Sequence, residues 1–190
     1  ALGLTTATVL RQRSELARLA GHDNLTGLPN RQQLDVHLKR TVSAHARDAS
    51  RQVGVLFVDL DNFKEINDTQ GHASGDIALQ VAAERIRAEI RNSDTLARWG
   101  GDEFVAVLTD LGEQKECEIV LSRLLQAAAS PVSIRQHTLQ LSASLGVTMY
   151  PQDGSDADTL LRHADQAMYQ AKQAGKNRYH LFDPEHDRQT

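Results

Sequence analysis

The sequence predicts an α+β domain built around one mixed sheet, because three features of the chain point to that class. Helix-like and strand-like segments alternate along the chain, which is typical of sheets covered by helices. Residues 53–58 are continuously apolar, as expected of a strand covered on both faces. Two further strand segments flank Gly100–Gly101, which is a hairpin signal and implies antiparallel pairing. We therefore expect a central mixed or antiparallel sheet of about five strands flanked by helices.

Composition and length fit one soluble domain with short extensions. The chain has 190 residues, of which 40% are hydrophobic and 24% charged, enough for a real core. Its net charge of −4 argues against a general nucleic-acid binder, which carries a broad basic face. The single cysteine, Cys117, allows no internal disulfide, as is usual in the cytoplasm.

A helix is predicted over residues 1–20, arriving from outside the domain. Apolar residues recur every seven positions and then once more three residues on, at Leu2, Val9, Leu16 and Leu19. This is a weak coiled-coil seam over barely two heptads. An amphipathic helix lying on its own domain fits the same residues, and both interpretations stay open.

The first ten residues are uncharged and are followed by Arg11 and Arg13. Because basic residues favour the inner side of a membrane, the segment fits the cytoplasmic end of a truncated transmembrane helix. The last turns of a soluble linker helix fit equally well. The chain lacks an initiator methionine, so we expect a fragment in either case, a cytoplasmic domain whose parent protein is or is not anchored in a membrane.

The remaining elements follow in order along the chain. The segment Asp23–Arg31 contains Asn, Gly and Pro and predicts a turn between helices. Further helices are predicted at 30–48, 75–91, 113–129 and 157–174. Gly175 stands where a glycine cap would end the last helix. Strands are predicted at 53–58, 95–98, 104–108, 131–135, 138–148 and 178–182, with His137 and its neighbours as a turn.

Two aspartates follow the first strand and make the first candidate site. Asp59 and Asp61 lie two residues apart, so they share a face if both keep the strand conformation. Carboxylates at a strand end suit Mg²⁺, which binds through one or two carboxylates plus substrate phosphates. Surface Asp-x-Asp pairs are also common, so this segment alone leaves metal binding open.

The second candidate site is the hairpin Arg98–Phe104. Gly100 and Gly101 permit the positive φ angles of a tight turn and leave room for a ligand. Asp102 and Glu103 follow at once, although adjacent acids are disfavoured at the start of a strand. A metal–phosphate site explains their presence, and a solvated acidic turn is the alternative.

Taken together, these motifs resemble the GGDEF family of diguanylate cyclases. The resemblance runs from about Asp23 to Phe182, and its motifs stand in order: DNLTGLPNR, VDLDNFKEINDTQGHASGD, GGDEF, SLGV and ADQAMYQAKQAGKNRY. It implies a palm-like fold of the nucleotide-cyclase type. It divides the chain into a linker or signalling helix at 1–22, a GGDEF catalytic domain at 23–183 and a C-terminal linker at 184–190.

The resemblance implies a metal site and a catalytic group. It assigns metal binding to Asp59, the backbone carbonyl of Leu60, Asp102 and Glu103. Asp102 and Glu103 are also the implied catalytic residues, with Asp102 accepting the proton of the attacking 3′-hydroxyl. The implied cofactor is Mg²⁺ or Mn²⁺, two ions per GTP.

The resemblance also implies how GTP is held. Asn67 and Asp76 match the residues that read the guanine edge, where a carboxylate accepts from N1–H and the amino group. Without the motif, Asp76 is explained by the helix dipole. The other implied contacts are Phe63, Lys64, Gly100, Gly101, Lys172 and Lys176.

The two lysines near the end match the positions that hold the terminal phosphates of GTP. Lys172 and Lys176 share a helical face if the helix continues past Gly175. The second position is often arginine in the family, so Lys176 keeps the charge but loses the bidentate fork. A solvated lysine face is the interpretation without the resemblance.

Arg91 and Asp94 match the inhibitory Arg-x-x-Asp site of the family, which binds the product. Arginine forks onto phosphate or stacks on guanine, and aspartate accepts from the guanine edge. A surface ion pair of little energetic weight is the alternative.

The implied activity is condensation of two GTP into cyclic di-GMP and two pyrophosphates. Each domain holds one GTP, so a homodimer is required, and cyclic di-GMP is both product and inhibitor. The alternative is a regulatory module that binds GTP or cyclic di-GMP without turnover. The tail LFDPEHDRQT resembles a linker to a phosphodiesterase (EAL) domain, so the expected neighbours are an upstream sensor and a downstream EAL domain.

Overall fold

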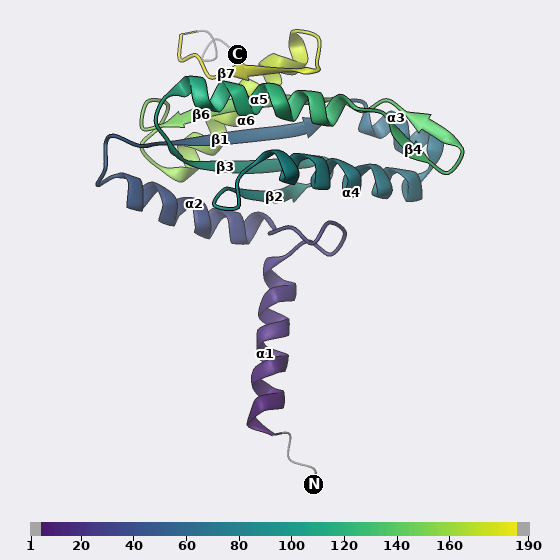
Figure 1. The fold of residues 1–190 in the computed structure, drawn as a ribbon, viewed down its shortest axis with the longest axis horizontal. Coiled ribbons are helices and arrows are strands. Elements are labelled where there is room, and N and C mark those ends of the chain that lie inside the picture. The colour runs from purple at the N-terminus through teal and green to yellow at the C-terminus, as the bar shows by residue number, and fades with distance from the viewer. Residues whose placement is uncertain (1–4, 186–190) are drawn as a thin grey trace.

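A five-stranded mixed sheet forms the centre of the protein, as the sequence predicts (Figure 1). The computed structural model describes residues 5–185, apart from the side chains of residues 17–19. The strand order is β2-β3-β1-β6-β7. Neighbouring strands are antiparallel except β6 and β7, which are parallel. The strands are β1 (Gln52–Leu60), β2 (Thr95–Gly100), β3 (Glu103–Leu111), β6 (Ala143–Tyr150) and β7 (Arg178–Leu181).

Helices cover both faces of this sheet, which explains why the first strand is apolar throughout. Leu56 and Val58 of β1 pack in one core with α4 (His72–Glu89) and α5 (Gln114–Ala129). Val55 and Phe57 pack in a second core with α2 (Arg31–His45) and α6 (Ala157–Gln173). Side chains alternate between the two faces of a strand, so each face needs its own apolar set.

The N-terminal helix α1 (Thr6–Gly21) projects away from the sheet rather than along it (Figure 1). Of the predicted seam, Val9 and Leu16 are 36% and 64% exposed. Leu2 and the side chain of Leu19 lie outside the described part of the chain. An exposed apolar row on a projecting helix favours the coiled-coil interpretation over packing on its own domain. No helix among residues 5–185 is long and apolar enough to cross a membrane.

The structure differs from the predicted elements in two places. A short helix, α3 (Phe63–Gln70), precedes α4, and α4 begins at His72 rather than at residue 75. The strand predicted at 138–148 is split into β5 (His137–Leu139) and β6, and β5 pairs with β4 (Val132–Ile134) in a separate two-stranded sheet. His137 lies in β5, and Arg135, with a φ of 57°, makes the turn instead. Residues 140–142 separate the two strands, and Ser142 is bonded to Asp61, just beyond the end of β1, through its carbonyl and its hydroxyl.

Helix α6 lies directly on β6 because Gly146 has no side chain. A Cβ atom at this position would stand 2.0 Å from the carbonyl oxygen of Ala164 and 2.1 Å from the amide nitrogen of Met168. The close contact sets the height of α6 above the sheet. It therefore also positions Lys172, which lies in the last turn of the helix.

Candidate active site

The β2–β3 hairpin places its two acids beside the end of β1. Asp59 and Glu103 are direct partners in the antiparallel register, so their side chains start from the same face of the sheet. The amide of Leu60 donates to the carbonyl of Asp102 at 3.2 Å, which fixes the hairpin tip against β1. Gly101 takes a φ of +50°, as the hairpin requires, whereas Gly100 does not use a positive φ.

Asp59 is a buried carboxylate with few protein partners. Burial raises its pKa to about 7, the nearby Asp102 carboxylate adds to the rise, and Lys172 acts against it. Lys172 Nζ lies 3.2 Å from Asp59 Oδ1 as an ion pair. Among the described residues, however, that oxygen has no partner in hydrogen-bond geometry. Asp59 is therefore held next to a cation but keeps an oxygen open to another ligand.

Asp61 has the opposite surroundings, although it lies only two residues away. Its carboxylate accepts hydrogen bonds from Ser142 Oγ at 2.7 Å, Ser144 Oγ at 2.6 Å and the backbone amide of Asn177 at 3.0 Å. It also pairs with Lys172 Nζ at 3.3 Å, and its side chain is 1% exposed. Because β1 ends at Leu60, Asp61 turns into the protein and joins β1, β6 and the loop before β7.

The two lysines predicted for the phosphates both lie at the end of β1, but not on one helical face. Helix α6 ends at Gln173, Gly175 takes a φ of 123° and Lys176 a φ of 65°. The condition for a shared helical face is therefore not met, and the predicted stop of the helix at Gly175 is confirmed. Lys176 reaches the site from the following loop, and its Nζ donates to Asn62 Oδ1 at 2.9 Å.

The residues predicted to read guanine lie together on α3 and α4. Gly75 of α4 allows the side chains of Asn67 and Phe63 on α3 to approach α4 closely, since a Cβ at Gly75 would stand 1.9 Å from Asn67 Oδ1 and 3.3 Å from Phe63 Cζ. Asp76 follows Gly75 and is exposed. It is the fifth residue of α4, beyond the first turn in which a helix dipole favours an acid. Lys64 is exposed on α3, beside Phe63.

Arg91 and Asp94 lie at the other end of β2 from the hairpin, in the turn that follows α4. Asp94 is 7% exposed, and its two oxygens accept from the backbone amides of Arg91 at 2.9 Å and Thr109 at 3.0 Å. The side chain of Arg91 is exposed. The structure thus separates this pair from the acids of the hairpin and gives Asp94 a role in shaping the turn.

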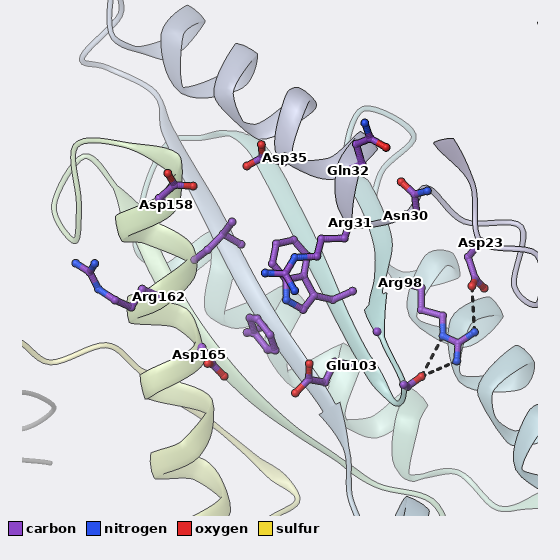
Figure 2. A pocket seen from close by; sticks show the side chains of 15 residues that line it. Asp23, Asn30, Arg31, Gln32, Asp35, Arg98, Glu103, Asp158, Arg162 and Asp165 are labelled. Carbon is purple, nitrogen blue, oxygen red and sulfur yellow. Dashed lines mark hydrogen bonds and ion pairs between the residues drawn. The ribbon is translucent and has the colours of Figure 1, made fainter. Parts of the chain in front are cut away.

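A cleft of about 1230 Å³ opens between α2 and α6 and reaches the hairpin (Figure 2). Phe57 and Trp99 belong to its lining, and the guanidinium of Arg31 lies 4.3 Å from the Trp99 ring centre. Glu103 and Asp165 face the same end of the cleft (Figure 2). Burial raises the pKa of both carboxyls, and for Glu103 the charges of Asp165 and Asp102 add to the rise.

Sequence reasoning missed the contact between the first turn and the hairpin. Arg98 Nη1 pairs with Asp23 Oδ1 at 3.1 Å, while Nε and Nη2 donate to the carbonyl of Gly101 at 3.0 and 2.8 Å (Figure 2). Asp23 follows α1, and Gly101 precedes Asp102. One guanidinium therefore joins the turn that follows α1 to the hairpin. The available signal was an arginine two residues before a Gly-Gly turn.

The oxygen donors at the end of β1 fit a divalent metal bound together with a phosphate ligand. Among the described residues, no three His, Cys, Asp or Glu side chains lie close enough to hold a metal unaided. Asp59 offers a buried oxygen without a hydrogen bond, and the Leu60 carbonyl faces Lys172 Nζ at 3.5 Å. Hard oxygen ligands in small number suit Mg²⁺, which takes its remaining ligands from phosphate and water.

A mixed sheet with a carboxylate-bearing hairpin beside two lysines defines a domain of the nucleotide-cyclase type. The family described as "Diguanylate cyclase, GGDEF domain" matches residues 20–178, and the chain belongs to this family. The resemblance drawn from the motifs is thereby confirmed.

Known relatives agree in sequence and in structure. The chain is 44% identical over 176 residues to the bifunctional diguanylate cyclase/cyclic di-GMP phosphodiesterase MucR of Pseudomonas aeruginosa, covering 93% of this chain and 25% of MucR. A truncated TpbB from the same species, comprising only its GGDEF domain, superimposes with a TM-score of 0.85 at 36% identity, covering 88% of this chain and 97% of that one.

A third relative contains a coiled coil in addition to its GGDEF domain. The coiled coil and GGDEF domain of DgcB from Caulobacter crescentus, in complex with cyclic di-GMP, superimposes with a TM-score of 0.79 at 26% identity. It covers 93% of this chain and 94% of the DgcB chain. By contrast, the chain spans only about a quarter of the length of MucR.

Proposed function

We propose that this domain is an active diguanylate cyclase that condenses two GTP into cyclic di-GMP. The observation that carries the proposal is the register of β1 and β3, which sets Asp59 opposite Glu103 with Asp102 at the hairpin tip. The GGDEF string is intact at Gly100–Phe104. Every catalytic position that the resemblance assigns carries a chemically competent residue.

The residues divide the reaction between them. Asn67 and Asp76 hold the guanine edge, with Phe63 and Lys64 beside the phosphates. Lys172 and Lys176 neutralise the terminal phosphates, and the backbone of Gly100 and Gly101 gives GTP close access to the hairpin. Asp59, the Leu60 carbonyl, Asp102 and Glu103 are the proposed metal ligands. Bound Mg²⁺ or Mn²⁺ supplies charge neutralisation for in-line attack on the α-phosphorus.

Asp102 is the proposed proton acceptor. The 3′-hydroxyl of one GTP forms a bond to the α-phosphorus of the other, its proton passes to the Asp102 carboxylate, and pyrophosphate leaves. The second bond forms in the same way from the other side. Since each domain holds one GTP, two domains must face each other, and the projecting helix α1 with its exposed Val9 and Leu16 supports pairing of two copies.

The proposed activity is tested by incubating the protein at high concentration with GTP and Mg²⁺ and separating the products by chromatography. Glu103→Gln, checked for folding by circular dichroism, is the control. Formation of cyclic di-GMP and pyrophosphate by the wild-type protein, but not by the Glu103→Gln control, supports the proposed cyclase activity. Tight GTP binding without product would favour the regulatory module instead, the second candidate that the two activities in the name of MucR bring forward.

Product inhibition through Arg91 and Asp94 is a second part of the proposal. The bonds of Asp94 fix the turn, and the guanidinium of Arg91 is exposed for a phosphate or a guanine. Arg91→Ala should keep initial rates and lose inhibition by added cyclic di-GMP. If Arg91→Ala is inhibited by the same concentration of cyclic di-GMP as the wild type, the inhibitory site lies elsewhere.

The surroundings of the domain are proposals of the same kind. We infer a linker helix at 1–22, a catalytic domain at 23–183 and a short linker at 184–190, within a longer protein that carries a sensor upstream and an EAL domain downstream. The domain is proposed to work in the cytoplasm. The natural reading frame around the sequence tests all of these points at once.

A further inference from the structure

The ammonium group of Lys172 lies among oxygen atoms that the proposed function gives to a metal. Nζ is 3.2 Å from Asp59 Oδ1, 3.3 Å from Asp61 Oδ1 and 3.5 Å from the carbonyl oxygen of Leu60. Asp59 and Leu60 are both proposed metal ligands. The lysine therefore already contacts two oxygen donors that a divalent ion would use.

The burial of the two carboxylates explains why a cation is held there. The side chains of Asp59 and Asp61 are 15% and 1% exposed, and that of Lys172 is 22% exposed. Two carboxylates buried side by side repel each other and lose hydration, so they need a compensating positive charge. Lys172 supplies that charge from within the chain.

The lysine cannot leave this position by movement of its helix. Gly146 lets the backbone of α6 rest on β6, and Ala164, Ala167 and Ala171 on the same helix are fully buried. Only the side chain beyond the helix surface is free to change its direction. The four-carbon stem of lysine gives it the reach to do so.

We propose that Lys172 is an internal counter-ion that occupies the metal position until nucleotide arrives, so that divalent metal and GTP bind together. The inference rests on the proposed function for the identity of the site and deepens it by assigning an order of binding. A divalent ion alone meets a positive charge at the site. The triphosphate offers the ammonium another partner, and the oxygens of Asp59 and Leu60 are then free for the metal.

Lys176 provides a matched control. Its ammonium also lies at the end of β1, but it donates to the amide oxygen of Asn62, 2.9 Å away, and forms no ion pair with a carboxylate among the described residues. Removing its charge leaves the proposed metal oxygens as they are. The two lysines thus differ in the property that the proposal uses.

The test measures the binding of Mn²⁺ in the absence of nucleotide. The electron paramagnetic resonance signal of the free ion reports how much Mn²⁺ is unbound. We expect Lys172→Gln to bind Mn²⁺ at least about tenfold more tightly than the wild-type protein, since a like charge has been removed. Lys172→Arg keeps the charge and should bind as weakly as the wild type, and so should Lys176→Gln. Adding Asp59→Asn to Lys172→Gln should abolish the gain.

Two results would overturn the proposal: Lys172→Gln binding Mn²⁺ no better than the wild type, or Lys172→Arg gaining as much as Lys172→Gln. Lys172→Met, which keeps the apolar stem, serves as the second variant if the glutamine variant fails to fold. Failure of the proposed function is a separate result. If the wild-type protein makes no cyclic di-GMP but Lys172→Gln still gains Mn²⁺ affinity, the counter-ion proposal stands and the proposed cyclase function is wrong.

Discussion

The end of β1 and the turn before β2 each contain buried aspartate, and the comparison separates structural carboxylates from available ones. In the turn, both oxygens of Asp94 accept from backbone amides. At the end of β1, Asp61 accepts three hydrogen bonds, whereas Asp59 keeps a buried oxygen without one among the described residues. An aspartate whose oxygens are satisfied by its own chain holds the fold together. One that is left unsatisfied is prepared for a ligand.

The largest expected effect is on activity, at Asp59. Asp59→Asn removes the charge that the proposed metal site requires, so we expect cyclic di-GMP formation to fall at least ~10²-fold. Rates with saturating GTP and Mg²⁺ measure this. The fold should remain intact, because no hydrogen bond to the affected oxygen is lost. An active Asp59→Asn protein would show that the unsatisfied oxygen has no part in catalysis.

Asp61 should behave in the opposite way. Asp61→Ala leaves the hydroxyls of Ser142 and Ser144 and the amide of Asn177 without their acceptor, next to a buried ammonium. Breaking such a buried charged network costs about 3–5 kcal/mol of unfolding free energy. Urea unfolding followed by circular dichroism measures the loss. If Asp61→Ala is as stable as the wild type, Asp61 has no larger structural role than Asp59, and the distinction between a structural and an available aspartate is wrong.

The stability of the metal-free protein should depend on pH through Asp59. Its pKa is about 7 in the folded chain against 3.8 ordinarily, so the folded state holds the proton more tightly. Stability from this group is therefore present below about pH 4, falls as pH rises towards 7, and stays lower above it. Asp59→Asn should be more stable than the wild type by ~1–3 kcal/mol at pH 8, after allowing for partial exposure.

The measurement is urea unfolding of the two proteins across pH 4–8 in the presence of a chelator. The difference in unfolding free energy should grow with pH and level off near pH 7. A difference independent of pH would mean that the carboxyl of Asp59 titrates at its ordinary value. Lys172 would then compensate it more strongly than burial and Asp102 oppose it.

Asp94 should show a smaller structural effect of the same kind as Asp61. Asp94→Ala leaves the backbone amides of Arg91, in the turn, and of Thr109, in β3, without their acceptor, at a cost of about 1–3 kcal/mol. Arg91→Ala, in the same turn, removes an exposed side chain and should change stability by less than ~0.5 kcal/mol. Thermal unfolding of the two variants measures the contrast. Equal losses would assign the guanidinium of Arg91 a structural role as well.

How far the sequence predicted these regions depends on whether a contact is local. The strand 53–58, the hairpin at Gly100–Gly101 and the stop at Gly175 follow from short-range patterns, and the structure contains all three. The split of 138–148 depends on pairing, because β5 joins β4 in one sheet and β6 joins β1 in the other, and Ser142 between them contacts Asp61, 81 residues earlier. No periodicity in either segment reveals such a contact, so the sequence predicted one continuous strand.

The site shows the same limit. Motif order pointed to Asp59, Asp102 and Glu103 as acids of one site, and the β1–β3 register brings them together. It did not show that Lys172 contacts Asp59 and Asp61, because α6 reaches the end of β1 only through the packing of Gly146. It also gave no sign that Asp23 and Arg98 are paired, 75 positions apart. Side-chain partners far apart in the chain are set by tertiary packing.

The smallest expected effect concerns Arg98, whose guanidinium joins the turn that follows α1 to the hairpin. Its three contacts use the planar fork of arginine, two to Gly101 and one to Asp23. Arg98→Lys keeps the charge but cannot serve both partners, so Asp102 should lose part of its positioning. We expect a fall in kcat of roughly 3–10-fold, equivalent to about 1 kcal/mol, with little change in KM for GTP.

Comparing Arg98→Lys with Asp23→Asn distinguishes an effect on the position of the hairpin from an effect on the stability of the fold. Asp23→Asn removes the ion pair at the linker end but leaves both bonds to Gly101, so it should reduce kcat less than Arg98→Lys does. If the two variants instead lose activity in proportion to their fall in melting temperature, Arg98 acts on the fold. If kcat falls while the melting temperature is unchanged, the guanidinium positions the hairpin, and the turn that follows α1 affects the proposed catalytic acids through it.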